Sequence, residues 1–195
     1  MVALLQRCHA SLVLALLVWS GSLQAADEFT ILKKPIEIPE RGRVMSYVLV
    51  TERGRFSFLP PPGWLAKNDP AEKSLSFTST NLSTCIALKL FASADSQTSK
   101  LNTNQLHQLI LDRYPDANVV RTFECYTSAE RGFAFDLERL AQNKTRLTTR
   151  LAFVAFPEAV VEFSLTTSAK HFADQHFTFG NLLTSFQIEP TLAKE

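Results

Sequence analysis

A short alternating run that ends in a proline corner constrains the fold of this chain more than any other feature. Phe56 and Phe58 lie two residues apart, which is the period of a β-strand with one buried face. Residues 60–63, Pro-Pro-Pro-Gly, cannot continue that strand, because proline lacks the N–H that a sheet requires. The sequence therefore predicts a strand that ends at this corner and returns Trp64 to the body of the domain.

The remaining sequence predicts strands interrupted by two helices. Alternating apolar runs bounded by turn residues predict strands over residues 44–50, 56–60, 74–78, 85–90, 119–126, 133–137, 147–155 and 161–165. Apolar residues at helical spacing predict a helix over residues 103–114, capped by Asn102 or Thr103, and a second helix over residues 179–186. This order of elements is typical of an α+β domain.

The N-terminal residues predict export from the cytoplasm. Arg7 precedes an apolar run over residues 12–19, and small residues around Ala25 follow it. This pattern predicts a signal peptide over residues 1–25, cleaved near Ala25, and a periplasmic or secreted protein. The run is short for a bilayer span and no later stretch is long enough, so we expect no membrane span after cleavage; a retained anchor is the alternative.

The rest of the chain divides into three parts. Residues 26–43 are interpreted as an extended leader, because Pro35 and Pro39 prevent a regular helix. The domain is expected over residues 44–190, followed by a tail over residues 191–195. Removing the signal peptide leaves equal numbers of basic and acidic residues, which gives no reason to expect nucleic acid as a partner.

Two cysteines remain in the predicted mature chain. Cys85 and Cys125 each lie within an apolar strand pattern. In an oxidising compartment a disulfide between them is the default expectation. Two buried free thiols are the alternative, because free cysteine is readily buried.

A polar ladder on the last three predicted strands is one candidate surface for binding. Their apolar positions are odd-numbered, so a register that buries these together places the even-numbered residues on the other face. On that face Arg150 is expected opposite Asp136 and near Glu162. An arginine flanked by carboxylates can orient an anionic ligand, although such cross-strand pairs are ordinarily surface contacts. The predicted contact surface is either a sheet edge or this polar ladder with the loops near Trp64.

Motifs for catalysis or metal binding are weak. The sequence has no nucleophile elbow, phosphate loop, dinucleotide fingerprint or zinc-protease motif. The predicted mature chain keeps His107, His171 and His176, and the last two are five residues apart, which does not suit one ion on a helix face. We therefore expect a non-catalytic protein without a cofactor. A hydrolase with a composite serine and histidine site, and a metal-binding envelope protein, are the alternatives.

The two ends of the expected domain resemble the PsbP-like domains, whose fold is shared with a Ran-binding nuclear import factor and several exported bacterial proteins. The resemblance covers about residues 46–189, and its signature residues are Phe56, Phe58, Pro62, Gly63, Trp64, Leu182, Leu183, Ser185 and Phe186. It implies an α/β/α sandwich with a central antiparallel sheet of about six to eight strands and two main helices. It also implies a non-catalytic accessory or binding module. No residues match the ion-binding histidines of the photosynthetic members.

These observations together predict an exported, soluble protein of the cell envelope. We expect it to engage a partner protein or a small ligand. The identity of that partner and the oligomeric state stay open at the level of sequence.

Overall fold

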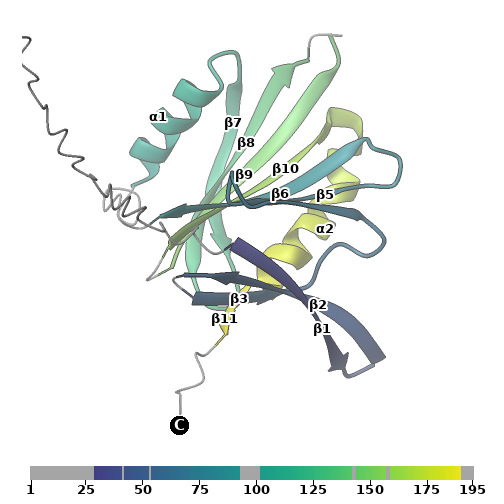
Figure 1. Ribbon diagram of the computed structural model, residues 1–195. Helices are drawn as coiled ribbons and strands as arrows, with labels where there is room; N and C mark the ends of the chain where they lie inside the picture. The colour runs from purple at the N-terminus through teal and green to yellow at the C-terminus, as the bar shows by residue number, and fades with distance from the viewer. Residues whose placement is uncertain are drawn as a thin grey trace, which may run out of the picture.

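The computed structural model describes residues 29–40, 42–52, 54–92, 102–141, 144–156 and 159–189. These residues form an α+β fold with two α-helices and two antiparallel sheets (Figure 1). The predicted signal peptide and the predicted tail lie outside the described residues. Within the described residues, no helix combines the length and the apolar character needed to cross a membrane.

The larger sheet has seven antiparallel strands. In spatial order these are β4 (Leu65–Asp69), β5 (Ser74–Thr78), β6 (Thr84–Ala92), β10 (Ala159–Ser168), β9 (Arg146–Ala155), β8 (Arg131–Leu140) and β7 (Asn118–Tyr126). The sequence predicted all of these except β4, whose residues read as a polar connection. β4 is a mostly exposed edge strand, so its side chains carry no apolar alternation.

The smaller sheet has four strands in the order β1 (Phe29–Ile38), β2 (Gly42–Thr51), β3 (Gly54–Phe58) and β11 (Gln187–Glu189). The segment interpreted as a leader thus contributes a full strand, β1, which pairs with β2 over its whole length. Pro35 is tolerated there because β1 is an edge strand, where a missing N–H on the outer side breaks no ladder. The single predicted sheet is therefore two sheets.

The two helices follow the predicted pattern with different bounds. α1 (Thr103–Arg113) begins at the predicted cap, Asn102, whose side chain accepts a hydrogen bond from the Gln105 N–H. α2 (Phe172–Ser185) follows a short 3-10 turn, η2 (Ala169–His171), and starts well before the predicted residue 179. Its first turns carry polar residues between Phe172 and Phe179, which hid the helical pattern.

Two apolar clusters hold the layers together. The first joins the four-stranded sheet, α2 and one face of the seven-stranded sheet. The second joins Leu106 and Ile110 of α1 to β8 and β9. The two segments that carry the resemblance to PsbP-like domains meet in the first cluster, where the Phe186 ring lies 5.3 Å from Phe56 and 5.6 Å from Phe58, centroid to centroid.

The register of the central strands corrects one prediction. β8 and β9 pair odd with odd positions, as in Phe135 opposite Leu151, which agrees with the prediction. β9 and β10, however, pair odd with even positions, as in Ala152 opposite Phe163. The odd-numbered apolar residues of β10 therefore lie on the opposite face from those of β9. Both faces of β9 are buried, so alternation alone does not fix which side is inward.

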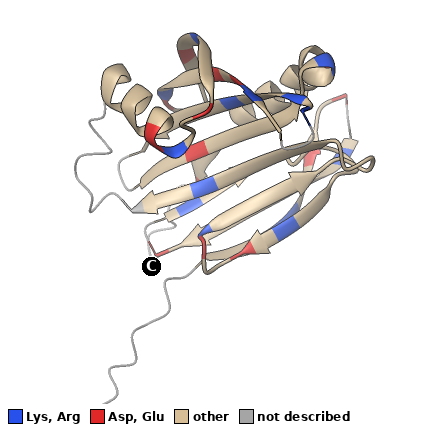
Figure 2. Cartoon of the chain, turned by 90° about the horizontal axis from the view of Figure 1, so that it is seen from above, with Lys and Arg blue, Asp and Glu red and all other residues tan. Residues whose placement is uncertain are grey.

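Charged residues are spread thinly over this framework. Figure 2 shows Lys and Arg interspersed with Asp and Glu on the strands and helices, without a large group of one sign. The full sequence has a similar balance, with 20 basic and 19 acidic residues.

Candidate binding site

A pocket opens where β3 separates from β2. The two strands pair from Thr51 opposite Gly54 to Tyr47 opposite Phe58, and the pairing then stops. The next residues of the chain include Pro60 and Pro61, which have no N–H to offer to a ladder. The chain turns instead toward α2, and the N–H of Leu59 donates to Ser185 Oγ at 2.9 Å. The prolines thus divert the backbone and leave space beside β2.

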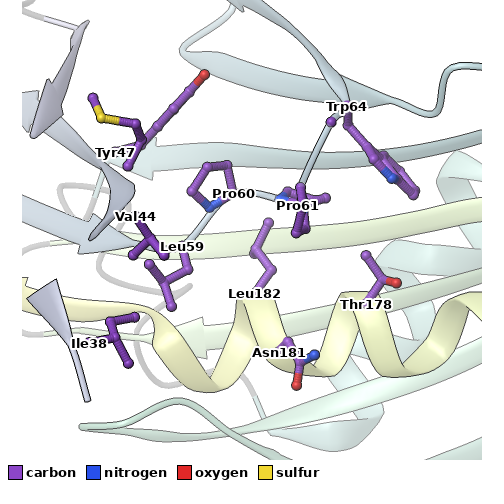
Figure 3. Close-up of a pocket in the computed structure, with 13 residues that line it drawn as sticks. Ile38, Val44, Tyr47, Leu59, Pro60, Pro61, Trp64, Thr178, Asn181 and Leu182 are labelled. Carbon is purple, nitrogen blue, oxygen red and sulfur yellow. The ribbon is translucent and has the colours of Figure 1, made fainter. Parts of the chain in front are cut away.

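The pocket in this space has a volume of about 550 Å³. Its walls come from the β1–β2 hairpin, the proline corner and α2 (Figure 3). Leu182 points from α2 toward Pro61, and Tyr47 lies on the other side of the proline corner. The lining residues are Ile38, Val44, Met45 and Tyr47 of the hairpin, residues 59–64 of the corner, and Thr178, Asn181 and Leu182 of α2.

The lining is apolar with a few neutral polar groups. Within the described part of the chain, no charged side chain lines the pocket. Thr178 and Asn181 supply a hydroxyl and an amide from α2, and Tyr47 supplies a phenol. A concave apolar surface with a few convergent polar groups is the usual composition of a ligand site.

Trp64 is held at the pocket by a tight turn. The N–H of Trp64 donates to the carbonyl of Pro61 at 3.3 Å. Gly63 has a φ of +75°, a conformation that a residue with a Cβ adopts only with strain. The turn therefore favours glycine at this position, and it presents the half-buried indole of Trp64 as part of the wall. The predicted return of Trp64 to the body of the domain is confirmed, but Trp64 is only half-buried and packs against the first apolar cluster without being part of it.

The predicted polar ladder contains one true pair. Arg150 donates from Nε to Asp136 Oδ1 at 2.7 Å and from Nη2 to Asp136 Oδ2 at 2.9 Å. Its guanidinium carbon also lies 4.7 Å from the ring centre of Phe123 and 5.0 Å from that of Phe172. Asp136 is buried, and only 14% of the Arg150 side chain is exposed. Two of the nitrogen atoms of the guanidinium are therefore held by Asp136, and two aromatic rings lie close to it.

Glu162 does not join Arg150, which corrects the prediction. It forms an ion pair with Arg113 at the end of α1. The β9–β10 register places Leu165, not Glu162, opposite Arg150. Because side chains alternate along a strand, Glu162 lies on the face that α1 covers and Leu165 on the other. The residues predicted as one surface, Trp64, Asp136, Arg150 and Glu162, therefore belong to three separate environments.

The predicted disulfide is wrong. Cys85 on β6 and Cys125 on β7 are both free. Strands β10, β9 and β8 lie between them, so four strand spacings separate the two, about 19 Å. A disulfide requires Cα atoms within about 7 Å. The two cysteine strands follow one another with only α1 between them in sequence, but they are far apart in the sheet.

Neither thiol is suited to reaction. Burial raises the pKa of Cys125 to about 12, although the nearby Arg150 charge and a backbone hydrogen bond from Gly132 act in the opposite direction. Burial also raises the pKa of Cys85. Only the thiolate is a good nucleophile, so the raised pKa makes each thiol a poorer nucleophile at neutral pH.

The three histidines lie apart from any partner that would suit catalysis. His107 lies near the ring of Phe135, and His176 Nδ1 is 2.7 Å from the carbonyl oxygen of Ala173. In the part of the chain that the structure describes, no histidine is hydrogen-bonded to a serine or a carboxylate, and no group of three metal-ligating side chains occurs. His171 belongs to η2, just before α2.

Comparison with solved structures identifies the type of fold. The chain is similar to cyanobacterial PsbP (CyanoP) from Synechocystis sp. PCC 6803, with a TM-score of 0.53 and 11% sequence identity, over 87% of this chain and 96% of that one. At this identity the likeness shows the fold alone, and the chain has a PsbP-like fold. No protein-family model and no curated protein match the sequence.

Two further structures are similar at TM-scores below 0.5, and the description of the fold does not depend on them. One is a protein of unknown function from Pseudomonas aeruginosa, described as a putative regulator. Its TM-score is 0.49 at 12% identity, over 82% of this chain and 99% of that one. The other is LpqN of Mycobacterium tuberculosis, described as involved in cell envelope biogenesis. Its TM-score is 0.45 at 9% identity, over 82% of this chain and 92% of that one.

Proposed function

We propose that this chain is an exported, non-catalytic binding protein of the cell envelope, and that the pocket at the proline corner holds its partner or ligand. The pocket is the observation that carries this proposal. Its volume of about 550 Å³ falls within the range of small-molecule sites. Its apolar walls and neutral polar groups suit an uncharged apolar group, from a small molecule or from a partner protein.

The chemistry of the described residues favours binding over catalysis. Arg150 and Asp136 satisfy one another, and Glu162 is paired with Arg113. The two cysteines have raised pKa values, and a thiol in that state is a poor nucleophile. Among the described residues, no arrangement of side chains supports the hydrolase or the metal-binding alternative.

The export part of the proposal comes from the N-terminal sequence. Residues 1–25 have the charged start, the apolar run and the small-residue exit of a signal peptide. Cleavage near Ala25 removes Trp19 and leaves Trp64 as the single tryptophan of the mature protein. Because Trp64 lines the pocket, its fluorescence reports directly on an occupant.

A matched pair of α2 variants tests the proposal. Asn181 is exposed and lines the pocket, whereas Thr184 is exposed one turn further along and does not. Asn181→Arg places a long charged side chain in an apolar pocket, and Thr184→Arg adds the same side chain outside it. The mature proteins are crosslinked in the native cell envelope, purified and analysed by mass spectrometry for bound proteins and small molecules.

We expect wild type and Thr184→Arg to retain the same partner or ligand, and Asn181→Arg to lose it. Trp64 emission should shift with the bound species in the first two proteins only. Identical capture by all three proteins would place binding elsewhere on the molecule. Residence of the processed protein in the cytoplasmic fraction would contradict the export part of the proposal.

A further inference from the structure

One wall of the pocket is the open edge of a strand. β2 runs from Gly42 to Thr51, but β3 pairs only with the half from Tyr47 to Thr51. Over residues 42–46, β2 has β1 on one side and no strand of the described chain on the other. Val44 and Met45, which lie within this unpaired half, both line the pocket. The pocket therefore occupies the place that β3 would fill if it continued beyond Phe58.

The pairing pattern indicates which backbone groups face this space. Thr51 and Gly54 are paired and only two residues of sequence lie between them, so this pair closes the hairpin and its backbone groups face inward across it. Backbone groups alternate sides along an antiparallel strand, so every second residue counted back from Thr51 points the same way. By this count Met45 directs its N–H and C=O toward the pocket. Val44 directs its own toward β1.

We propose that the pocket binds an extended apolar segment of a partner protein as an added strand along residues 42–46 of β2. This inference rests on the proposed function and names the class of partner. The backbone of the segment would pair with the β2 edge, and alternate side chains would enter the pocket between Tyr47 and Leu182. Five residues of edge correspond to about 17 Å of strand, so a short segment is sufficient.

Charge complementarity further defines the segment. Among the described residues, no charged side chain lines the pocket, so side chains that enter it are neutral and apolar. Lys33 does not line the pocket, but its Nζ lies 5.6 Å from the ring centre of Tyr47, which does, and Lys33 has no ion pair within the described residues. The segment that fits carries an acidic residue at the end nearest Tyr47. The structure thus favours a peptide with alternating apolar residues and one terminal carboxylate side chain.

Defined peptides test this inference on the mature full-length domain. The probe is a six-residue peptide of alternating valine and threonine with aspartate at one end, followed by Trp64 fluorescence and by amide NMR. The first control replaces the aspartate by lysine. The second control is a pair of peptides with the same sequence, one N-methylated at the odd-numbered residues and the other at the even-numbered residues. Each peptide loses the backbone donors along one of its two edges and keeps its side chains. We expect one of the two N-methylated peptides to bind about tenfold more weakly than the unmodified peptide, which is the effect of losing backbone hydrogen bonds.

Two protein variants test the same contact from the other side. Met45→Pro removes the N–H that faces the pocket, and Met45→Ala removes only the side chain. We expect Met45→Pro to bind the peptide about tenfold more weakly than Met45→Ala, because only proline removes the donor. The N-methylated peptides act on wild-type protein, so the test holds even if Met45→Pro does not fold.

The remaining outcomes are distinguishable. Peptide binding that Asn181→Arg abolishes but N-methylation leaves unchanged would overturn strand pairing while the pocket stays a binding site. A dimer of this chain that Met45→Pro dissolves would show a second copy as the occupant and overturn the partner peptide. If no peptide binds, the inference fails. The proposed function fails with it only if Asn181→Arg also leaves envelope capture unchanged.

Discussion

The cluster around Arg150 and the pocket at the proline corner use their polar groups in opposite ways. In the cluster, both oxygens of Asp136 accept from Arg150, and the rings of Phe123 and Phe172 cover the guanidinium. In the pocket, the walls are apolar, and over residues 42–46 the edge of β2 has no partner strand among the described residues. The cluster pairs its charges within the chain, whereas this strand edge stays unpaired there.

This contrast teaches where to look for function in a chain without catalytic motifs. The charged residues that stand out in the sequence stabilise the fold. The site arises where three prolines interrupt a ladder, because a diverted backbone leaves both a cavity and an unpaired strand edge. Four changes sharpen the contrast between a structural interior and an open pocket.

The largest expected effect is that of Phe186→Ala. The Phe186 ring contacts the rings of Phe56, Phe58, Phe156 and Phe163, and it is fully buried. Loss of such a ring removes apolar contacts and leaves a cavity, so the free energy of unfolding should fall by about 4 kcal/mol. Urea unfolding measures this directly. A loss below about 1 kcal/mol would show that the contact between the two signature segments is not central.

Asp136→Ala is expected to follow. It leaves the mostly buried Arg150 without its carboxylate, and removal of one partner from such a pair costs about 3 kcal/mol. Peptide or ligand binding at the pocket should not change. The control is Glu124→Ala, which removes an exposed pair with Arg131 and should change stability by no more than about 0.5 kcal/mol. If the Asp136→Ala protein is folded but binds the peptide or ligand more weakly than wild type, the Arg150 cluster becomes a candidate binding site.

Gly63→Ala should have a smaller effect, confined to the pocket. The φ of +75° at Gly63 is strained for alanine, so stability should fall by about 1 kcal/mol, and the emission of Trp64 should shift. Gly180→Ala on α2 is the matched control, since its Cβ also meets nothing within 4 Å but its backbone is helical. That variant should gain up to about 1 kcal/mol. Equal responses would show that the turn does not depend on positive φ.

The last prediction concerns pH. The pKa of Cys125 rises from 9.0 to about 12 on folding, so above pH 9 the unfolded chain releases a proton that the folded chain keeps. The contribution of this thiol to stability is therefore unchanged below about pH 9 and is lost as the pH rises toward about 12. Cys125→Ala should show a weaker alkaline loss than wild type in unfolding measured from pH 8 to 11. Parallel curves would contradict a buried, protonated thiol.

Much of the fold follows from local patterns in the sequence. Alternation located most strands, and helical spacing with the cap at Asn102 located α1 to within one residue at its C-terminal end. The polar edge strand β4 and the proline-containing edge strand β1 were not predicted, because an edge strand needs neither an apolar face nor a hydrogen bond from every N–H. The sequence did not predict the separation of Cys85 from Cys125, because the order of strands in a sheet can differ from their order in the sequence.

The site was less accessible from sequence than the fold. Asp136 opposite Arg150 was correct because adjacent strands joined by a short connection leave few registers. Glu162 was misplaced because β9 has apolar residues on both faces, which leaves the register with β10 open. One feature of the sequence does indicate an unpaired strand edge, because three prolines follow a predicted strand whose partner is longer. The sequence does not indicate that α2 closes the space beside this edge, so the pocket itself could not be predicted.

A photocrosslinking amino acid placed at two positions tests whether the pocket or the Arg150 cluster is the binding surface. One variant carries it at Met45 in the wall of the pocket, and the other at Arg121, which lies over the ring of Phe123 beside the Arg150 cluster. Both proteins are irradiated in the cell envelope, and the products are identified by mass spectrometry. We expect a discrete crosslinked product from the Met45 position and none from the Arg121 position. The reverse result would contradict it and would make the Arg150 face the binding surface.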